Sequence, residues 1–363
     1  MAIHYTHEQY EKLRHTYRRW WDGALDRPIV PIVTHGHPSD VAPCGPRLCF
    51  GNAWDTAIDP RDFVNAYDAA MDSHRWHGEG YPLFRTDAFG PGVLAAFLGA
   101  TPEGTSHTVW FHPPKKDIPI EELHFEWNDA NPCYRRVENL FEAAMEKWRG
   151  RVVVGMTDLG GTLDVLQTFR GAENLLMDLY DDPDEVLRCI REIQAMWLLC
   201  FDKLNAIMEG EAEGYSHWYA MYHERPGYIL QSDFSYMIGP DMFRTFVAPE
   251  LAAMAGHMDK AVYHMDGIGQ IPHLDQLLAM DDILGIQWVP GDGEPSTRNW
   301  DELMSKILAS GKKLIHRTQK ADGSPIDITR DRAGQLYFEP RSFHVSQMAA
   351  ARRYGEMLGV AVD

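Results

Sequence analysis

The chain has 363 residues, of which 45% are hydrophobic and 24% are charged, a composition typical of soluble globular proteins. Its 34 basic and 53 acidic residues give a formal charge of −19, which argues against nucleic acid and anionic membrane surfaces as partners and disfavours substrates with many carboxylates. Five cysteines without a Cys-x-x-Cys motif, an N-terminus without a signal-peptide core, and no apolar run near the roughly 20 residues of a membrane span predict a reduced, cytoplasmic protein.

Hydrophobic periodicity and turn signals predict alternating helices and strands. From the N-terminus these are a helix at 6–26, a strand at 29–33, a helix at 60–76, a weak strand at 81–87, a helix at 134–149 and a strand at 151–157. Then come helices at 162–178 and 183–209, a strand ending at residue 217, a helix at 239–257, strands at 260–264, 284–288, 312–316 and 335–338, and helices at 272–279, 298–310 and 343–358. Three stretches are left, of which residues 38–58 are expected to be an irregular loop. Residues 90–130, punctuated by proline and glycine, are interpreted as a lid insertion, and 218–236 is a long aromatic segment.

Three short motifs mark the boundaries of helices. Thr6 stands three residues before Gln9, which is the spacing of a capping box. Asp59 precedes a proline at the first position of the next helix. The turn at Gly160-Gly161-Thr162 leaves two interpretations open, a small-anion site at a helix N-terminus or a tight turn, and the tight turn is favoured.

Eight strands, most of them followed by a helix, predict a parallel sheet, and eight such units predict a single closed (β/α)8 barrel of the TIM type over residues 1–363. Residues 1–27 form an N-terminal helical extension in this interpretation, and insertions lie over the C-terminal mouth. A doubly wound open sheet is the alternative. It is disfavoured because no Gly-x-Gly-x-x-Gly motif follows the first strand.

Polar side chains recur where predicted strands end, which is where chemistry takes place in α/β enzymes. His264 and Asp266 end one strand and are two residues apart, so their side chains project from the same face. An imidazole with a carboxylate suits Zn²⁺ or another divalent ion. Glu339 and His316 are the best candidates for a third ligand. The alternative is a histidine that donates to its neighbouring aspartate without a metal.

Other polar residues at or near strand ends are candidates for binding or catalysis. The catalytic candidates, which can exchange protons or pair with a substrate carboxylate, are His217, Tyr219, Asp233, His316 and Arg317. The substrate-binding candidates are His35, Asp87, Asp158 and Trp288. Asp87, Asp158 and Asp233 have an alternative explanation as caps of turns. No Gly-x-Ser-x-Gly elbow is present, which argues against a hydrolase of the covalent type.

Four segments resemble the uroporphyrinogen decarboxylase superfamily, which also contains zinc- and corrinoid-dependent methyltransferases: residues 154–163, 177–185, 232–249 and 262–267. The likeness extends in diluted form over about residues 60–360. The true decarboxylases carry an Arg-Gln-Ala-Gly-Arg stretch after the first strand, and this chain has Thr34-His35-Gly36-His37-Pro38 there. Without that cationic cluster, decarboxylation of a porphyrinogen is not expected.

The methyltransferases of this superfamily are the better match. They ligate zinc through His-x-Cys and a later cysteine. Here His264 matches the histidine, Asp266 replaces the first cysteine, and Glu339 lies near the second. The resemblance therefore implies a metal-assisted methyltransferase that works with a corrinoid carried by a separate protein. Because oxygen ligands make a harder Lewis acid than thiolates, a small oxygen-linked substrate such as a methyl ether or alcohol is expected.

Two other functions stay open at this stage. One is a cofactor-free decarboxylase or lyase acting on a small acid, with Asp233 and Arg317 as the working pair. The other is a barrel that binds a ligand without catalysis. The sequence also leaves a homodimer open.

Overall fold

The computed structural model of the chain describes residues 3–291, 293–294, 300–316 and 330–363. Arg317 lies outside the described residues. The helices are α1 (His7–Trp21), α2 (Pro60–Met71), α3 (Leu94–Phe97), α4 (Pro132–Trp148), α5 (Thr162–Arg170), α6 (Ala172–Asp181), α7 (Pro183–Met208), α8 (Pro240–Phe246), α9 (Ala248–His257), α10 (Leu274–Leu278), α11 (Asp301–Ala309) and α12 (Met348–Met357). The strands are β1 (Pro31–His35), β2 (Arg75–Gly78), β3 (Leu83–Phe84), β4 (Thr101–Gly104), β5 (Val109–His112), β6 (Val153–Met156), β7 (Ser216–His217), β8 (Tyr228–Gln231), β9 (Ala261–Asp266), β10 (Ile283–Val289), β11 (Lys313–His316), β12 (Leu336–Phe338) and β13 (Arg341–His344).

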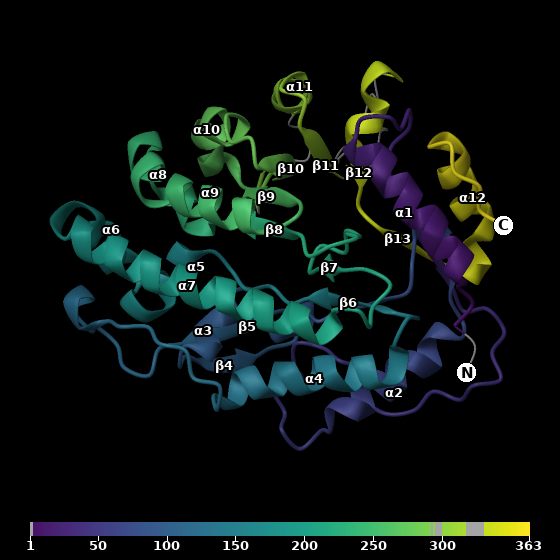
Figure 1. Cartoon of the computed structure of the whole chain (residues 1–363), viewed down its shortest axis with the longest axis horizontal. Helices are drawn as coiled ribbons and strands as arrows, with labels where there is room; N and C mark the ends of the chain where they lie inside the picture. The colour runs from purple at the N-terminus through teal and green to yellow at the C-terminus, as the bar shows by residue number, and fades with distance from the viewer. Residues whose placement is uncertain (1–2, 292, 295–299, 317–329) are drawn as a thin grey trace.

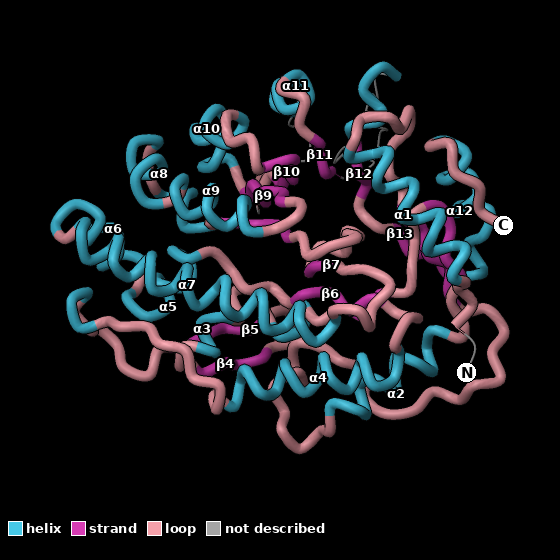
Figure 2. The backbone as a smooth tube through the Cα atoms, in the orientation of Figure 1, coloured by secondary structure: helices cyan, strands magenta, loops and turns pink. Residues whose placement is uncertain are grey.

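The strands form several hydrogen-bonded sheets (Figure 1). The largest has five parallel strands in the order β12-β11-β10-β9-β8. A second parallel sheet has the order β3-β6-β7, and a third, β13-β1-β2, contains one antiparallel pair. β4 and β5 form a separate antiparallel hairpin. Figure 2 shows most of these strands in the middle of the molecule, with helices around them.

The parallel strands share one interior although they belong to different sheets. A buried cluster takes Val153 from β6, Ile229 from β8 and Val262 from β9, together with residues before or on the other strands: Ile29, Tyr81, Ile315 and Tyr337. Tyr10, Tyr17 and Trp20 of α1 complete this cluster. Because Val153, Ile229 and Val262 lie near the beginnings of their strands, α1 closes the N-terminal end of a barrel-like interior.

The predicted mixed α/β fold with parallel strands is confirmed, whereas the closed eight-stranded barrel is not. Among the described residues the sheets are joined only locally, for example by a single parallel bridge between Ile29 and Tyr337. The two predicted helix caps are confirmed. The Thr6 hydroxyl accepts the Gln9 N–H in a complete capping box, and the Asp59 carboxylate accepts the Arg61 N–H.

Several predicted elements differ from the structure. The helix expected over 162–178 is divided at Gly171, whose φ of 81° lies in the left-handed region that ends an α-helix. The helix expected over 239–257 is divided at Val247 into α8 and α9. The aromatic segment 218–236 contains β8, which the sequence did not predict. The short strands β2, β4, β5 and β13 were also missed.

The predicted insertion, residues 90–130, contains α3 and the β4–β5 hairpin. Its first residues contact the turn after β6: the Val93 N–H donates to the Asp158 carbonyl at 2.8 Å. At Gly160 an added Cβ would lie 2.6 Å from the Cα of Gly92, so the two backbones are in contact there. Among the described residues, no helix has the length and apolar character needed to cross a membrane.

Candidate metal centre at the strand ends

Three side chains that could bind a metal ion meet beyond the ends of β8 and β9. His264 and Asp266 are the last polar residues of β9, and Asp233 begins the short 3-10 helix η3 (Asp233–Met237) just after β8. Gln231 of β8 pairs with His264 of β9, so the two parallel strands end at the same edge. One ligand atom from each of Asp233, His264 and Asp266 lies within 4.8 Å of the other two.

His264 is held in one orientation by a neighbouring strand. Its Nδ1–H donates to Oε1 of Gln287 on β10 at 2.6 Å, which leaves Nε2 facing Oδ2 of Asp266 at 3.7 Å. The ring of Trp218 stands edge-on to the imidazole, with centroids 5.2 Å apart, and the His264 side chain is only 12% exposed. Burial lowers the pKa of His264, but Asp266, Asp233 and Gln287 outweigh it, so the pKa is raised overall.

Two aspartates near His264 have raised pKa values. Asp233 remains accessible to solvent, yet the protein around it removes enough water to raise its pKa, and the charge of Asp266 adds to this effect. Burial raises the pKa of Asp158 to about 7, against a hydrogen bond that its Oδ1 accepts from the Gly160 N–H at 2.9 Å. The charges of Asp233 and His264 also act on Asp158, so it belongs to the surroundings of the centre. The side chain of Asp158 itself is hydrogen-bonded to the Gly160 N–H, within the glycine turn that follows β6.

The donor set fits a divalent metal ion. A neutral imidazole whose Nδ1–H is occupied offers its Nε2 lone pair, and this arrangement is common for histidine ligands. Two carboxylates supply oxygen ligands and negative charge. Asp233, and not the expected Glu339, joins His264 and Asp266 in this group. If a strand had been assigned to residues 228–231, Asp233 would have been recognised as a candidate ligand. It would then follow the end of a strand that neighbours β9.

Glu339 and His316 lie beside one another at the ends of β12 and β11. The Glu339 N–H donates to the His316 carbonyl at 3.2 Å, and the His316 Nδ1–H donates to the Trp288 carbonyl at 3.3 Å. Trp288 is buried and packs against Trp300, with ring centroids 4.9 Å apart. Glu339, His316 and Trp288 therefore lie together at the ends of three neighbouring strands, β12, β11 and β10.

His217 lies away from the metal candidates. Ser216, the preceding residue, meets the Tyr81 hydroxyl of the barrel-like interior at 2.9 Å, so alternation along β7 turns His217 to the other face. There its ring lies 5.2 Å from that of His223 and 5.8 Å from that of Tyr228. The Nδ1 of His217 accepts the Tyr219 N–H at 3.3 Å, and burial lowers the pKa of His217 well below the usual value. Trp218, whose position in the sequence suits the wall of a pocket, contacts His264 instead.

The other candidates occupy separate positions. Tyr219 lies beside Trp218 and Tyr337, with ring centroids 6.0 and 6.4 Å away. Asp87 forms an ion pair with Arg85 at 2.9 Å. The Arg85 guanidinium also donates to the Trp218 carbonyl at 3.0 Å. This bond connects the ion pair to Trp218, the residue whose ring contacts His264. His35 ends β1 in a group of histidine rings, 5.9 Å from His74 and 5.4 Å from His344.

No protein-family model matches the chain, and no curated protein matches it either. Among solved structures it is similar to a methyltransferase from Methanosarcina mazei, with a TM-score of 0.55 and 11% sequence identity. The alignment covers 89% of this chain and 96% of that one. The likeness concerns the fold, and it extends over nearly all of both chains.

Proposed function

We propose that the chain is a metal-assisted methyltransferase, which moves a methyl group between a small oxygen-linked substrate and a corrinoid held by a separate protein. The observation that carries the proposal is the grouping of Asp233, His264 and Asp266 within 4.8 Å. The fold shared with a methyltransferase from Methanosarcina mazei adds support. Zn²⁺ or another divalent ion is the proposed cofactor, with Asp233 as the third ligand.

The residues around the centre have distinct roles in this proposal. Gln287 keeps the Nε2 of His264 directed at the ion site by accepting a hydrogen bond from the Nδ1–H. Trp218 covers one edge of the imidazole and limits the access of water. When bound, the ion would act as a Lewis acid toward an oxygen of the substrate. A site with two carboxylates and one imidazole favours an oxygen compound over a thiol.

The metal content of the purified protein is the first test. After incubation with Zn²⁺ and removal of the excess, the wild-type protein should retain about one equivalent. His264→Ala should bind Zn²⁺ at least about tenfold more weakly, because a ligand is lost. His257→Ala is the control, since His257 pairs with Asp202 at 2.8 Å on the surface of α9 and α7. Full Zn²⁺ retention by His264→Ala would remove the ligand assignment.

Methyl transfer is the second test. The Zn²⁺-loaded protein would be mixed with cob(I)alamin as a free methyl acceptor and with methanol or an aryl methyl ether as donor. The cobalt takes the methyl group, and the oxygen that loses it takes up a proton. Formation of methylcobalamin is followed by its absorbance. Its dependence on both the ion and His264 would support the proposal, and turnover that survives chelation would contradict it.

A metal-free decarboxylase or lyase is the second candidate, and one observation favours it. Asp233 has a raised pKa beside a histidine whose pKa is also raised, so the two groups could share a proton during catalysis. Arg317, its expected partner, lies outside the described residues. In this case chelators would leave the activity unchanged, whereas Asp233→Asn would abolish it.

A further inference from the structure

The carboxylate of Asp164 is hydrogen-bonded both to the start of α5 and to the turn that carries Asp233. Its Oδ2 accepts the Gly161 N–H at 3.2 Å and the Asp233 N–H at 3.0 Å. Its Oδ1 accepts the Phe234 N–H at 2.7 Å. Three backbone donors thus converge on one side chain, which joins the start of α5 to the start of η3.

The start of α5 is itself fixed against neighbouring elements. The Thr162 hydroxyl donates to Glu250, a buried residue of α9. At Gly161 the backbone runs so close to the end of β8 that an added Cβ would lie 2.4 Å from the Gln231 carbonyl oxygen. Asp164 therefore extends from a rigid support, as a residue that orients a functional group should.

The start of α5 contains the glycine turn at Gly160 and Gly161, for which the sequence left open a small-anion site or a tight turn. A free helix N-terminus offers N–H groups to a small anion. Here the Gly161 N–H is bonded to the protein's own Asp164 carboxylate. This bond fits the tight turn that the sequence favours.

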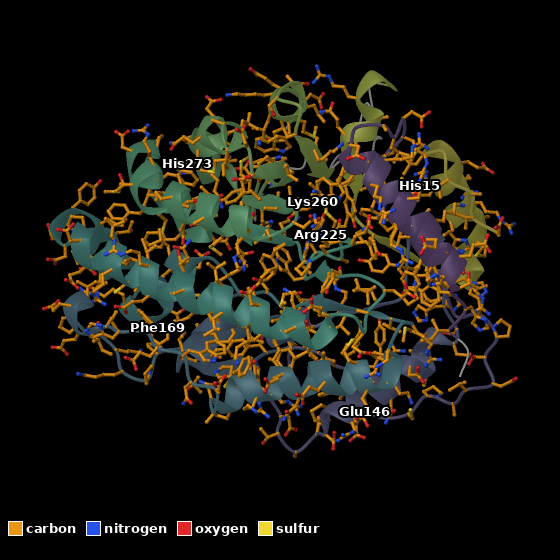
Figure 3. The ribbon with its side chains drawn as sticks, in the orientation of Figure 1. His15, Glu146, Phe169, Arg225, Lys260 and His273 are labelled. Atoms are coloured by element: carbon orange, nitrogen blue, oxygen red, sulfur yellow. The ribbon has the colours of Figure 1, made fainter. Side chains whose placement is uncertain are left out.

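The 3-10 helix η3 has a second attachment at its middle. The Ser235 carbonyl accepts the Nε2–H of His273 at 2.9 Å, and the Ser235 hydroxyl donates to the Ser232 carbonyl at 2.6 Å. The ring of His273, which Figure 3 labels, stacks on Phe243 at 4.4 Å. These contacts hold the body of η3, while Asp164 holds the amides of Asp233 and Phe234.

We propose that Asp164 is a positioning residue for the metal centre, because it fixes the backbone of Asp233 so that this carboxylate stays beside His264 and Asp266. This inference rests on the proposed metal function. A shift of about 1 Å in the turn is enough to loosen a preorganised site. Since Asp164 is not one of the three grouped residues, its loss would weaken binding without removing a ligand.

Titration with Co²⁺, followed by visible absorption, tests this role, because Co²⁺ accepts the same nitrogen and oxygen ligands and its spectrum reports their geometry. Asp164→Asn keeps the shape of the side chain, but its amide nitrogen cannot accept a hydrogen bond. The dissociation constant for Co²⁺ should rise about 10- to 100-fold, and the spectrum at saturation should change. Asp62→Asn, the same change at the same helix position on the exposed start of α2, should match the wild type.

The outcomes separate this inference from the proposed function. Unchanged Co²⁺ affinity and spectrum in folded Asp164→Asn would overturn the positioning role and leave the metal centre intact. Failure of the wild-type protein to bind Co²⁺ or Zn²⁺ would overturn both. If Asp164→Asn does not fold, amide hydrogen exchange in the wild-type protein decides. The amides of Asp233 and Phe234 should be protected, and fast exchange of both would contradict the role.

Discussion

The imidazole of His264 and the side-chain amide of Gln287 face each other across two paired strands, with 2.6 Å between Nδ1 and Oε1. β9 and β10 place the two residues directly in register. The contact occupies the Nδ1–H and leaves Nε2 on the side of Asp266. Gln287 therefore determines which nitrogen of His264 is offered to a ligand.

Replacement of Gln287 should weaken metal binding although Gln287 is not itself a proposed ligand. In Gln287→Leu the imidazole loses its acceptor and can rotate or change its tautomer, so Zn²⁺ affinity should fall about 10- to 100-fold. Competition with a chromophoric chelator measures the Zn²⁺ affinity of each variant. Gln276→Leu is a matched control, because Gln276 is partly exposed on α10 and its side-chain amide donates to the Pro240 carbonyl at 2.9 Å, outside the group around His264. Equal affinities in the two variants would contradict the role of Gln287.

Gly161→Ala should be costly because of close contact rather than helix capping. A Cβ at this position would lie 2.4 Å from the Gln231 carbonyl oxygen. Gly239 is also a helix N-cap with nearly the same backbone angles, but an added Cβ would meet no atom within 4 Å. Alanine is a poorer N-cap than glycine at both sites, so the comparison isolates the clash. Gly161→Ala should reduce the free energy of unfolding by about 1–3 kcal/mol more than Gly239→Ala, measured by urea denaturation. Equal losses would show that α5 can move away from β8.

Glu250 should make the protein less stable as the pH rises. Burial raises its pKa from 4.5 to about 8, and the charge of Asp164 acts in the same direction. Between these values the folded protein keeps a proton that the unfolded chain releases. The folded state therefore loses stability with increasing pH, by about 1.4 kcal/mol per pH unit at most.

Glu250→Gln removes this titration while keeping an acceptor for Thr162. Its melting temperature should be close to that of the wild type near pH 5 and should exceed it increasingly toward pH 8. Glu146→Gln, on the exposed side of α4 (Figure 3), is the control, since its side chain is 67% exposed. Parallel pH profiles for Glu250→Gln and the wild type would contradict the raised pKa.

The sequence was most informative where local chemistry determines local structure. The caps at Thr6 and Asp59 were recognised because each is formed by neighbours within three residues. His264 and Asp266 were placed together correctly, because alternation along one strand is enough to put both on one face. Such rules need no knowledge of the rest of the fold.

Contacts between distant segments were out of reach. β8 lies in an aromatic segment whose composition also suits a packed loop, so Asp233 was expected as a catalytic residue and not as a third member of the group with His264 and Asp266. The orientation of His217 depends on Ser216 facing Tyr81, 135 residues earlier. Asp164 looked like an ordinary residue in the first turn of a helix, and only its bonds to Asp233 and Phe234 distinguish it.

The contact between Gly92 and Gly160 restricts how the insertion of residues 90–130 can move. The two backbones touch where an added Cβ at Gly160 would lie 2.6 Å from Gly92, and Val93 is bonded to Asp158 immediately beyond. If this insertion opens and closes over the mouth, its pivot must lie after Val93. Admission of substrate would then be governed by the β4–β5 hairpin, and Gly160 could acquire a side chain only if the segment at Gly92 moved away from it.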